Sequence, residues 1–296
     1  MALQALYDLP APAKLNLFLH VTGRRADGYH LLQSVFVLID WADTLHVERR
    51  GDGQLRRHDL GPTLPADDLS LRAARALQQA SGCRYGADIS VQKNVPWGAG
   101  MGGGSSDAAT VLLALNRLWR LDWPRSRLLE LAAPLGADVP FFVGGDNAFV
   151  EGIGEKLAPV AWAPRRYAVV KPAESLGTAG IFSHPDLARD TEPATLAGSV
   201  AQLNAQQESS ATFANAAYFG RNDLQPVAQA LCPSIAEVAR WLEARFGNSR
   251  MTGSGSAVFA TVGADGAAWP EGELPQGWSG RMCRSLAHHP LRDWAV

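Results

Sequence analysis

The sequence is poor in cysteine and has no excess of positive charge. Its three cysteines, Cys83, Cys232 and Cys283, are an odd number without a CxxC spacing, which argues against a disulfide framework and a thiolate metal site. We expect each to be a small buried or inert residue. Lys plus Arg number 27 against 29 Asp plus Glu, so the formal charge is -2. Proteins that coat nucleic acid need an excess of basic side chains, and this class is therefore disfavoured.

Long apolar runs and a leader are also missing. No stretch of the sequence approaches the roughly 18 uninterrupted apolar residues of a transmembrane helix. The first residues, MALQALYDLPAPAKLNL, lack the basic start and apolar centre of a signal peptide. We therefore expect a cytoplasmic protein that does not span a membrane.

The composition is that of a folded protein with two domains. Hydrophobic residues make up 47% of the chain and charged residues 19%, unlike a disordered sequence. A length of 296 residues at about 150 residues per domain predicts two domains. The periodic pattern weakens around residues 159–164, so we place the domains at 1–160 and 161–296.

Alternating polar and apolar residues predict a half-buried strand over residues 13–19, with Lys14 and Asn16 side by side on its polar face. Taken alone, such a pair is typical of an exposed strand edge. Residues 34–40 predict a more buried strand, and residues 190–210 a long surface connection or weak helices. Further helices are expected at 68–79, 108–121, 124–133 and 235–246, and further strands at 89–92, 148–154, 167–171 and 257–262.

A glycine-rich loop is the most unusual segment of the chain. Residues 96–107 read PWGAGMGGGSSD, with five glycines in twelve residues, and run directly into the predicted helix. Glycine lets the backbone wrap an anion, and a helix N-terminus offers unpaired N–H groups. The loop lacks the Lys of a Walker A motif and the setting of a dinucleotide fingerprint. A phosphate site is therefore favoured over a flexible surface loop. At Gly103 we expect a positive φ, a backbone angle that a β-branched residue such as valine does not adopt.

Two other polar positions have simple structural interpretations. Asp138 stands just before a proline suited to the first turn of a helix, so it can be an N-cap residue, a role compatible with catalysis. The pair His288 and His289 lies in a polar tail without acidic or thiolate partners at metal-ligand spacing. We expect both histidines to be solvated.

Three blocks, PAKLNLFLHVTGRRADGYHLLQS, PWGAGMGGGSSDAA and MTGSGSAVF, resemble the GHMP superfamily of small-molecule kinases in order and separation. PAKLNL followed by DGYH is specific to one branch, and GADVPFF and EGIGE support that branch. The resemblance covers essentially the whole chain, although residues 190–210 match no motif. It implies an α+β, two-domain GHMP-kinase fold with a ribosomal-protein-like N-terminal domain, a ferredoxin-like C-terminal domain and a cleft between them.

The resemblance also implies the reaction. ATP would donate its γ-phosphoryl group to the 2-hydroxyl of a methylerythritol that carries a cytidine diphosphate, in the non-mevalonate isoprenoid pathway. Asp138 would be the general base, Lys14 the orienting cation and Asn16 a hydrogen-bonding partner near the transferred group. Such parts suit phosphoryl transfer, which depends on positioning and charge stabilisation. Mg²⁺ is expected with ATP, without an identified protein ligand.

The remaining site residues fall into three groups under the same resemblance. The ATP phosphates would bind the loop residues Pro96, Gly98, Ala99, Gly100, Met101, Gly102, Gly103, Gly104, Ser105 and Ser106. Ser106 would be the one to reach phosphate or magnesium. The cytidine end of the substrate would contact Tyr29, His30, Thr178 and Phe182, and the cleft would be lined by Gly253, Ser254, Gly255 and Ser256.

Two alternatives stay open at this point. The first is another kinase of the superfamily, acting on homoserine, mevalonate or a sugar, against which residues 28–30 and Phe182 argue. The second is a non-catalytic nucleotide-binding or RNA-binding protein on the ribosomal-like fold, against which Lys14, Asn16 and Asp138 argue. The sequence leaves open whether the protein is a monomer or a homodimer.

Overall fold

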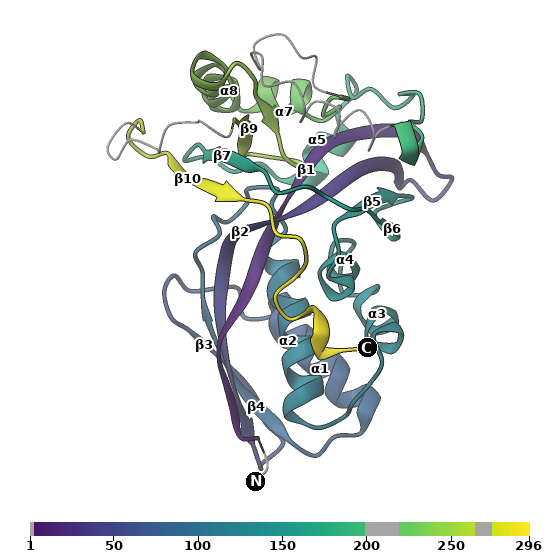
Figure 1. Ribbon diagram of the computed structural model, residues 1–296, viewed down its shortest axis with the longest axis vertical. Helices are drawn as coiled ribbons and strands as arrows, with labels where there is room; N and C mark the ends of the chain where they lie inside the picture. Colours follow the sequence, from purple (N-terminus) through teal and green to yellow (C-terminus); the bar gives the residue numbers. More distant parts are fainter. Residues whose placement is uncertain (1–2, 199–218, 264–273) are drawn as a thin grey trace.

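The computed structural model describes residues 3–198, 219–263 and 274–296. These residues form two sheets with helices packed against them (Figure 1). The larger sheet has the strand order β3-β4-β2-β5-β6, with β1 paired to β2, and the smaller has the order β10-β7-β9-β8. The mixed helices and sheets confirm the predicted α+β class.

The element bounds are as follows. The larger sheet contains β1 (Ala5–Arg24), β2 (His30–Arg50), β3 (Leu55–Asp59), β4 (Gly86–Gln92), β5 (Ala148–Glu151) and β6 (Lys156–Pro159), accompanied by α1 (Leu69–Ser81), α2 (Gly103–Leu118), α3 (Arg125–Ala132) and α4 (Val139–Gly144). The smaller sheet contains β7 (Arg166–Lys171), β8 (Arg250–Met251), β9 (Val258–Val262) and β10 (Ser279–Arg284), accompanied by α5 (Thr178–Ser183), α7 (Gln225–Leu231), α8 (Pro233–Phe246) and the short η1 (Arg292–Trp294).

The long antiparallel hairpin of β1 and β2 extends from the larger sheet to the smaller one (Figure 1). One face of β1 carries Leu15 and Leu17, which pack in a core with Tyr167 and Phe259 of the smaller sheet. The opposite, polar face is buried as well, contrary to the predicted half-buried strand. Lys14 and Asn16 on this face meet distant segments: Lys14 N donates to the Met101 carbonyl, Lys14 Nζ lies 3.5 Å from Asp138, and Asn16 N donates to Thr252 Oγ1. Alternation in sequence does not encode such long-range packing.

The free edge of β1 is closed by loops rather than by another strand. Lys14 N donates to the Met101 carbonyl of the glycine-rich loop, and Leu19 N donates to the Arg221 carbonyl. Pro10 and Pro12 lie within this strand, which is tolerated because an edge strand needs fewer ladder donors. The edge therefore brings the glycine-rich loop against Lys14.

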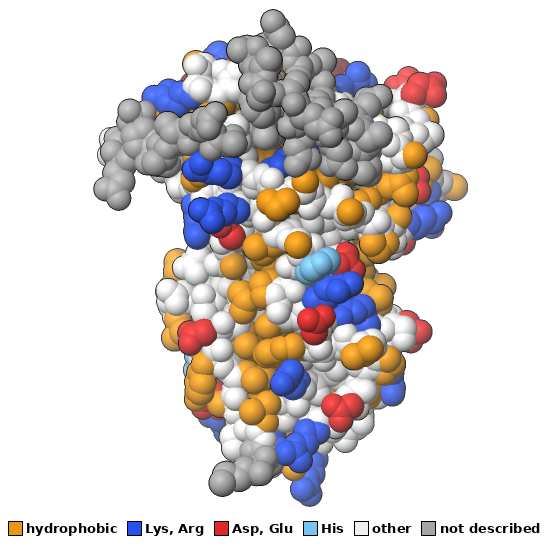
Figure 2. Space-filling model, viewed as in Figure 1, with side chains coloured by type: hydrophobic (Ala, Val, Ile, Leu, Met, Phe, Trp, Pro, Cys, Tyr) orange, Lys and Arg blue, Asp and Glu red, His pale blue; other side chains and the backbone are white. Residues whose placement is uncertain are grey.

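Several smaller expectations can be compared with the described residues. Cys232 and Cys283 are buried, Cys83 is half-buried, and all three are free thiols. No helix in the described part of the chain is long and apolar enough to cross a bilayer. Residues 190–210 were expected to form a surface connection or weak helices, and those from 199 onward lie outside the residues that the structure describes. On the face shown in Figure 2, acidic and basic side chains are interspersed.

The chain after β10 returns to the larger sheet, where its last residues contact α3 and α4 (Figure 1). His289 N donates to the Gly145 carbonyl, and the Arg125 guanidinium donates to the carbonyls of Val143, Gly144 and Ala295. His289 is buried, with 2% of its surface exposed, which corrects the expectation that both tail histidines are solvated. His288 is exposed and bonds Asp146 at 2.7 Å.

The buried His289 should make the fold sensitive to acid. Burial and then the charge of Arg125 lower the pKa of His289 to about 4, whereas an unfolded histidine has a pKa of about 6.5. Between these values the unfolded chain binds a proton that the folded chain does not, so the free energy of unfolding falls as pH falls from 6.5 to 4. For this one group, the loss between pH 7.5 and pH 5 is about 2 kcal/mol.

His289→Asn retains an acceptor for Leu291 N, which now donates to His289 Nδ1, but does not titrate. We expect urea unfolding at pH 7.5 and pH 5 to show a smaller difference in the variant than in the parent. Equal differences in both proteins would exclude His289 as a source of acid sensitivity.

Candidate active site

A cleft of about 390 Å³ lies between β1, the glycine-rich loop, the start of α4 and the turn before β9. It collects many of the residues singled out in the sequence from distant segments. Those that line it are Lys14, Asn16, Gly98, Gly100, Gly102, Ser105, Asp138, Thr178, Phe182, Gly253, Ser254 and Gly255. Pro96, Ala99, Met101, Gly103, Gly104, Ser106 and Ser256 are not among its lining residues, and Tyr29 and His30 line an adjoining cavity.

Lys14 and Asn16 project together from the polar face of β1, as predicted. Lys14 Nζ donates to Asn16 Oδ1 at 2.5 Å, and Asn16 Nδ2 donates to Ser34 Oγ at 3.0 Å. Both amide atoms of Asn16 are thus engaged, so its amide holds the ammonium group of Lys14. Lys14 is 3% exposed; burial lowers its pKa, and Asp138 opposes that shift.

Asp138 stands at the N-cap position of α4 but makes no capping hydrogen bond with its side chain. Its Oδ2 lies 3.5 Å from Lys14 Nζ, and 29% of the carboxylate side chain is exposed. Asp138 therefore occupies the N-cap position that the sequence predicted, but its side chain does not make the hydrogen bond of an N-cap residue. The carboxylate is left facing the cleft beside a cation.

The glycine-rich loop is held tightly against the turn before β9. A Cβ at Gly100 would lie 2.3 Å from the Thr252 carbonyl oxygen, and one at Gly253 would lie 2.6 Å from the Gly100 carbonyl oxygen. At Gly102, φ is +72° and a Cβ would lie 3.4 Å from Lys14 Cε. Glycine is required at these contacts because two backbones approach and because φ is positive.

Gly103 differs from this pattern, which corrects the expectation of a positive φ there. It is the first residue of α2, and a Cβ at this position would meet Val95 Cγ1 at 3.3 Å. A side chain would be restricted by neighbouring atoms rather than by the backbone angle. The first N–H groups of α2 have no acceptor within the helix, so this end of the helix remains a donor surface for an anion.

Of the two serines in the loop, Ser105 lines the cleft and Ser106 does not. Ser106 is fully buried, and its hydroxyl donates to the Pro12 carbonyl of β1 at 2.7 Å. A contact between Ser106 and phosphate or magnesium is therefore not supported by its position. Ser256 is likewise buried and donates to the Glu174 carbonyl at 2.6 Å.

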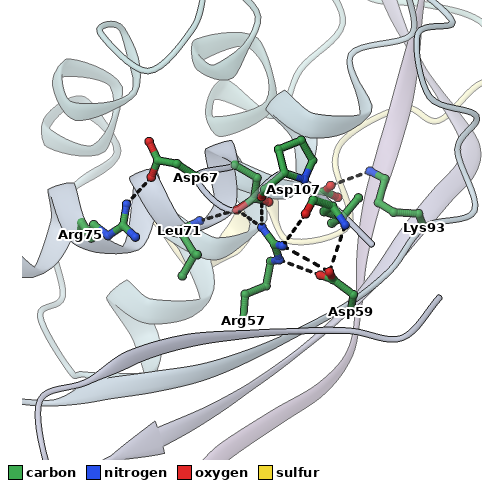
Figure 3. A network of polar contacts seen from close by, with 10 residues as sticks. Arg57, Asp59, Asp67, Leu71, Arg75, Lys93 and Asp107 are labelled. Atoms are coloured by element: carbon green, nitrogen blue, oxygen red, sulfur yellow. Dashed lines mark hydrogen bonds and ion pairs between the residues drawn. The ribbon is translucent and has the colours of Figure 1, made fainter. Parts of the chain in front are cut away.

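A buried charged cluster beneath the loop was not identified from the sequence. Lys93 Nζ contacts Asp43 and lies 2.6 Å from Asp107 Oδ2 (Figure 3 shows Lys93 and Asp107). Burial raises the pKa of Asp107 to about 7, and Lys93 opposes the shift. Asp43 Oδ1 also accepts from the backbone N–H groups of residues 94 and 95. The cluster fixes the start of the glycine-rich loop, and a signal for it in the sequence was a lysine three residues before that loop, at Lys93.

The adjoining cavity shares Leu32, Ile153 and Phe182 with the cleft and is lined by Tyr29 and His30. The rings of His30 and Phe182 stack with centroids 5.0 Å apart, and His30 Nε2 accepts from Arg189 Nε at 3.1 Å. Burial and the charges of Arg189 and Arg24 lower the pKa of His30. Tyr29 is 60% exposed. Two aromatic rings and the His30 imidazole therefore border a cavity that shares a wall with the cleft.

A third cavity, of about 500 Å³, lies at the start of the glycine-rich loop and was also missed from the sequence. Its walls are residues 62–65 and 93–97. Trp97, at one wall, is 62% exposed. Prolines and the exposed Trp97 give this cavity apolar walls, which suit the binding of a flat aromatic ring.

The chain matches two family models and many known proteins. The family described as "GHMP kinases N terminal domain" matches residues 68–146, and "GHMP kinases C terminal" matches residues 201–268. The chain is 60% identical to a 4-diphosphocytidyl-2-C-methyl-D-erythritol kinase of Methylibium petroleiphilum, with 100% of each chain covered, and 59% identical to one of Variovorax paradoxus, with 99% and 100% covered.

The chain also resembles solved structures of GHMP kinases over most of its length. A crystal structure of 4-(cytidine 5'-diphospho)-2C-methyl-D-erythritol kinase is 33% identical, has a TM-score of 0.74, and the match covers 93% of this chain and 98% of that one. A crystal structure of a homoserine kinase from Cytophaga hutchinsonii is 15% identical and has a TM-score of 0.67, and the match covers 97% of this chain and 96% of that one. At this identity the match shows a shared fold and nothing about the substrate.

Proposed function

The chain belongs to the 4-diphosphocytidyl-2-C-methyl-D-erythritol kinases, a branch of the GHMP kinases, and we propose that its cleft performs phosphoryl transfer with Asp138, Lys14 and Asn16. The enzyme is a kinase of the non-mevalonate isoprenoid pathway, with ATP as donor and an alcohol as acceptor. The acceptor group is proposed to be the 2-hydroxyl of the methylerythritol. Because ATP is the donor, we propose that the enzyme works in the cytoplasm.

One observation carries the chemical proposal: a carboxylate and a buried ammonium group, 3.5 Å apart, face a glycine-rich helix N-terminus across a single cleft. The Asp138 carboxylate accepts the proton of the acceptor hydroxyl. The hydroxyl oxygen forms a bond to the γ-phosphorus, the bond from that phosphorus to the bridging oxygen of ATP breaks, and ADP leaves. Lys14 stabilises negative charge on the transferred group.

Asn16 has a positioning part in this scheme. Its amide oxygen accepts from Lys14 and one N–H of its amide nitrogen donates to Ser34, which leaves the second N–H able to donate to the phosphoryl group. We assign it the task of holding Lys14 in one orientation. This task adds to the one that the family resemblance implied, that of a hydrogen-bonding partner near the transferred phosphoryl group.

Mg²⁺ would arrive with ATP and neutralise charge on the phosphates. Of the described residues that line the cleft, Asp138 is the sole acid, and no group of three or more metal-ligating side chains occurs in the described ranges. Mg²⁺ commonly keeps several waters and binds through substrate phosphates, which fits so few protein ligands. The Ser105 hydroxyl is the candidate protein contact.

The donor base is proposed to occupy the third cavity. The acceptor fills the cleft on the side of Lys14 and Asp138, and the ATP phosphates lie along the glycine-rich loop. Residues 62–65 and 93–97 line the cavity at the start of that loop. A nucleotide whose phosphates follow the loop therefore reaches this cavity with its base.

The cytidine of the acceptor is proposed to bind the cavity bordered by Tyr29, His30 and Phe182. Tyr29→Ala and Phe182→Ala are each expected to raise the KM for the cytidine substrate by about 5- to 150-fold, since stacking on one ring contributes roughly 1–3 kcal/mol. The KM for ATP should stay nearly constant. Steady-state kinetics with both substrates varied measures this, and Tyr7→Ala is a matched control because Tyr7 is 57% exposed and bonds Glu48 on the distant part of the hairpin.

Equal rises in the two KM values would instead mean general damage to the cleft. Unchanged KM values in both variants would remove the aromatic residues from the cytidine site.

Release of ADP in the presence of Mg²⁺ and ATP tests the acceptor. 4-Diphosphocytidyl-2-C-methyl-D-erythritol should support rapid release, whereas homoserine, mevalonate and galactose should not exceed the rate without acceptor. Faster turnover of one of these three would assign the enzyme to that substrate, and ATP binding without any turnover would support a non-catalytic nucleotide-binding protein.

A further inference from the structure

Arg57 of β3 is a buried cation that the proposed chemistry does not use. Its side chain is 7% exposed, and every guanidinium nitrogen contacts either Asp59 at the end of β3 or the chain between β3 and α1 (Figure 3). Nε lies 2.7 Å from Asp59 Oδ1, and Nη1 lies 2.9 Å from Asp68 Oδ1. Nη1 also donates to the Pro65 carbonyl at 2.7 Å, and Nη2 donates to the Leu64 carbonyl at 3.1 Å.

The segment that Arg57 holds is one wall of the third cavity, namely residues 62–65. Asp59 Oδ2 accepts from Leu64 N at 3.0 Å, and Asp68 caps α1 by accepting from Leu71 N at 3.1 Å. Arg57 therefore contacts the two aspartates that flank residues 60–67, Asp59 and Asp68, and two carbonyls between them. Its hydrogen bond with Asp59 lowers the pKa of that carboxyl, as expected of a partly buried pair with bidentate geometry.

The opposite wall is fixed independently. Lys93 contacts Asp43 and Asp107, and Asp43 accepts from the backbone of residues 94 and 95. The wall of residues 93–97 is thus held by Asp43 and Asp107, the acidic partners of Lys93, and the wall of residues 62–65 is held by Arg57. Without Arg57, the carboxylates of Asp59 and Asp68 and the carbonyls of residues 64 and 65 would lose their common partner. A ligand would then have to order residues 60–67 when it binds, at a cost in binding free energy.

We propose that Arg57 is a positioning residue for the donor nucleotide, which presets the wall of residues 62–65 against which the base binds. This inference rests on the assignment of the donor base to the third cavity. Arg57 does not touch the cleft in which phosphoryl transfer is proposed. Its loss should weaken binding of a nucleotide but not of a bare polyphosphate, because the phosphates bind at the glycine-rich loop.

Calorimetric titration with ATP and with tripolyphosphate tests this without requiring turnover. Arg57→Met should weaken ATP binding by about tenfold or more, which corresponds to the ordering of a short loop, and leave tripolyphosphate affinity unchanged. Arg56→Met is the matched control, because Arg56 is the exposed neighbour whose guanidinium contacts Gln54. In steady-state assays the KM for ATP should rise in Arg57→Met while the KM for the cytidine substrate does not.

Arg57→Lys keeps the charge but not the planar fork, so it should bind ATP with intermediate affinity, and it serves if Arg57→Met does not fold. Unchanged ATP affinity in a folded Arg57→Met protein, or in Arg57→Lys if only that variant folds, would overturn the proposal. An equal loss of ATP and tripolyphosphate affinity would also overturn it. A protein that binds ATP as described but does not phosphorylate the cytidine substrate would contradict the proposed function and not this role of Arg57.

Discussion

Asp138→Asn is expected to lower kcat by at least about 100-fold, the contribution of a positioned acid or base, while ATP affinity and thermal stability stay close to those of the parent. The amide cannot accept the hydroxyl proton, but it has nearly the shape of the carboxylate. Because the Asp138 side chain is 29% exposed and makes no capping hydrogen bond, the contact that the substitution removes is the ion pair with Lys14 at the edge of the cleft. Steady-state kinetics with a thermal unfolding scan measures both effects.

Asp52→Asn is the control for this substitution. Asp52 lies after β2, and its carboxylate pairs with Arg50 with 42% of the side chain exposed, a kind of ion pair that contributes little. Its turnover should equal that of the parent. If Asp138→Asn turned over within a few-fold of the parent, Asp138 would not be the base.

Lys14→Met should lower kcat by about 100- to 1000-fold, as expected when a preorganised group that stabilises the transition state is lost. Methionine fills much of the same volume but leaves the buried Asn16 amide oxygen and the Asp138 carboxylate without their cation. We therefore expect a lower melting temperature for a protein that still folds, and kinetics are compared at a temperature at which both proteins are folded.

Lys156→Met, at an exposed position of β6, should change neither kinetics nor stability. A Lys14→Met protein that stayed active would show that the ammonium group is dispensable. A loss of activity that merely followed unfolding would assign Lys14 a structural role.

The local features of the site could be predicted from the sequence. Alternation along β1 put Lys14 and Asn16 on one face, and their side chains do meet at 2.5 Å. The glycine-rich loop was expected to lead into a helix, and α2 begins within it at Gly103. Both inferences depend only on the geometry of a few consecutive residues. The kind of acceptor, by contrast, came from the family resemblance and not from any single residue.

Features that depend on packing between distant segments were not predictable. Lys14 and Asn16 of β1 are buried against the glycine-rich loop, Asp138 and Thr252, and the sequence does not encode that proximity. Which serine faces the cleft depends on how α2 packs on β1, and this packing directs Ser106 to the Pro12 carbonyl. The role of Arg57 is visible only once residues 62–65 and 93–97 are seen to form one cavity.

Product analysis tests the central claim most directly. The protein is incubated with ATP, Mg²⁺ and 4-diphosphocytidyl-2-C-methyl-D-erythritol, and phosphorus NMR follows the reaction while ADP is quantified. The account predicts one new phosphomonoester signal, coupled to the carbon that bears the 2-hydroxyl, in amounts equal to the ADP formed, and its loss in Asp138→Asn. Release of free phosphate without a phosphomonoester, transfer to a different hydroxyl, or equal product from Asp138→Asn would contradict it.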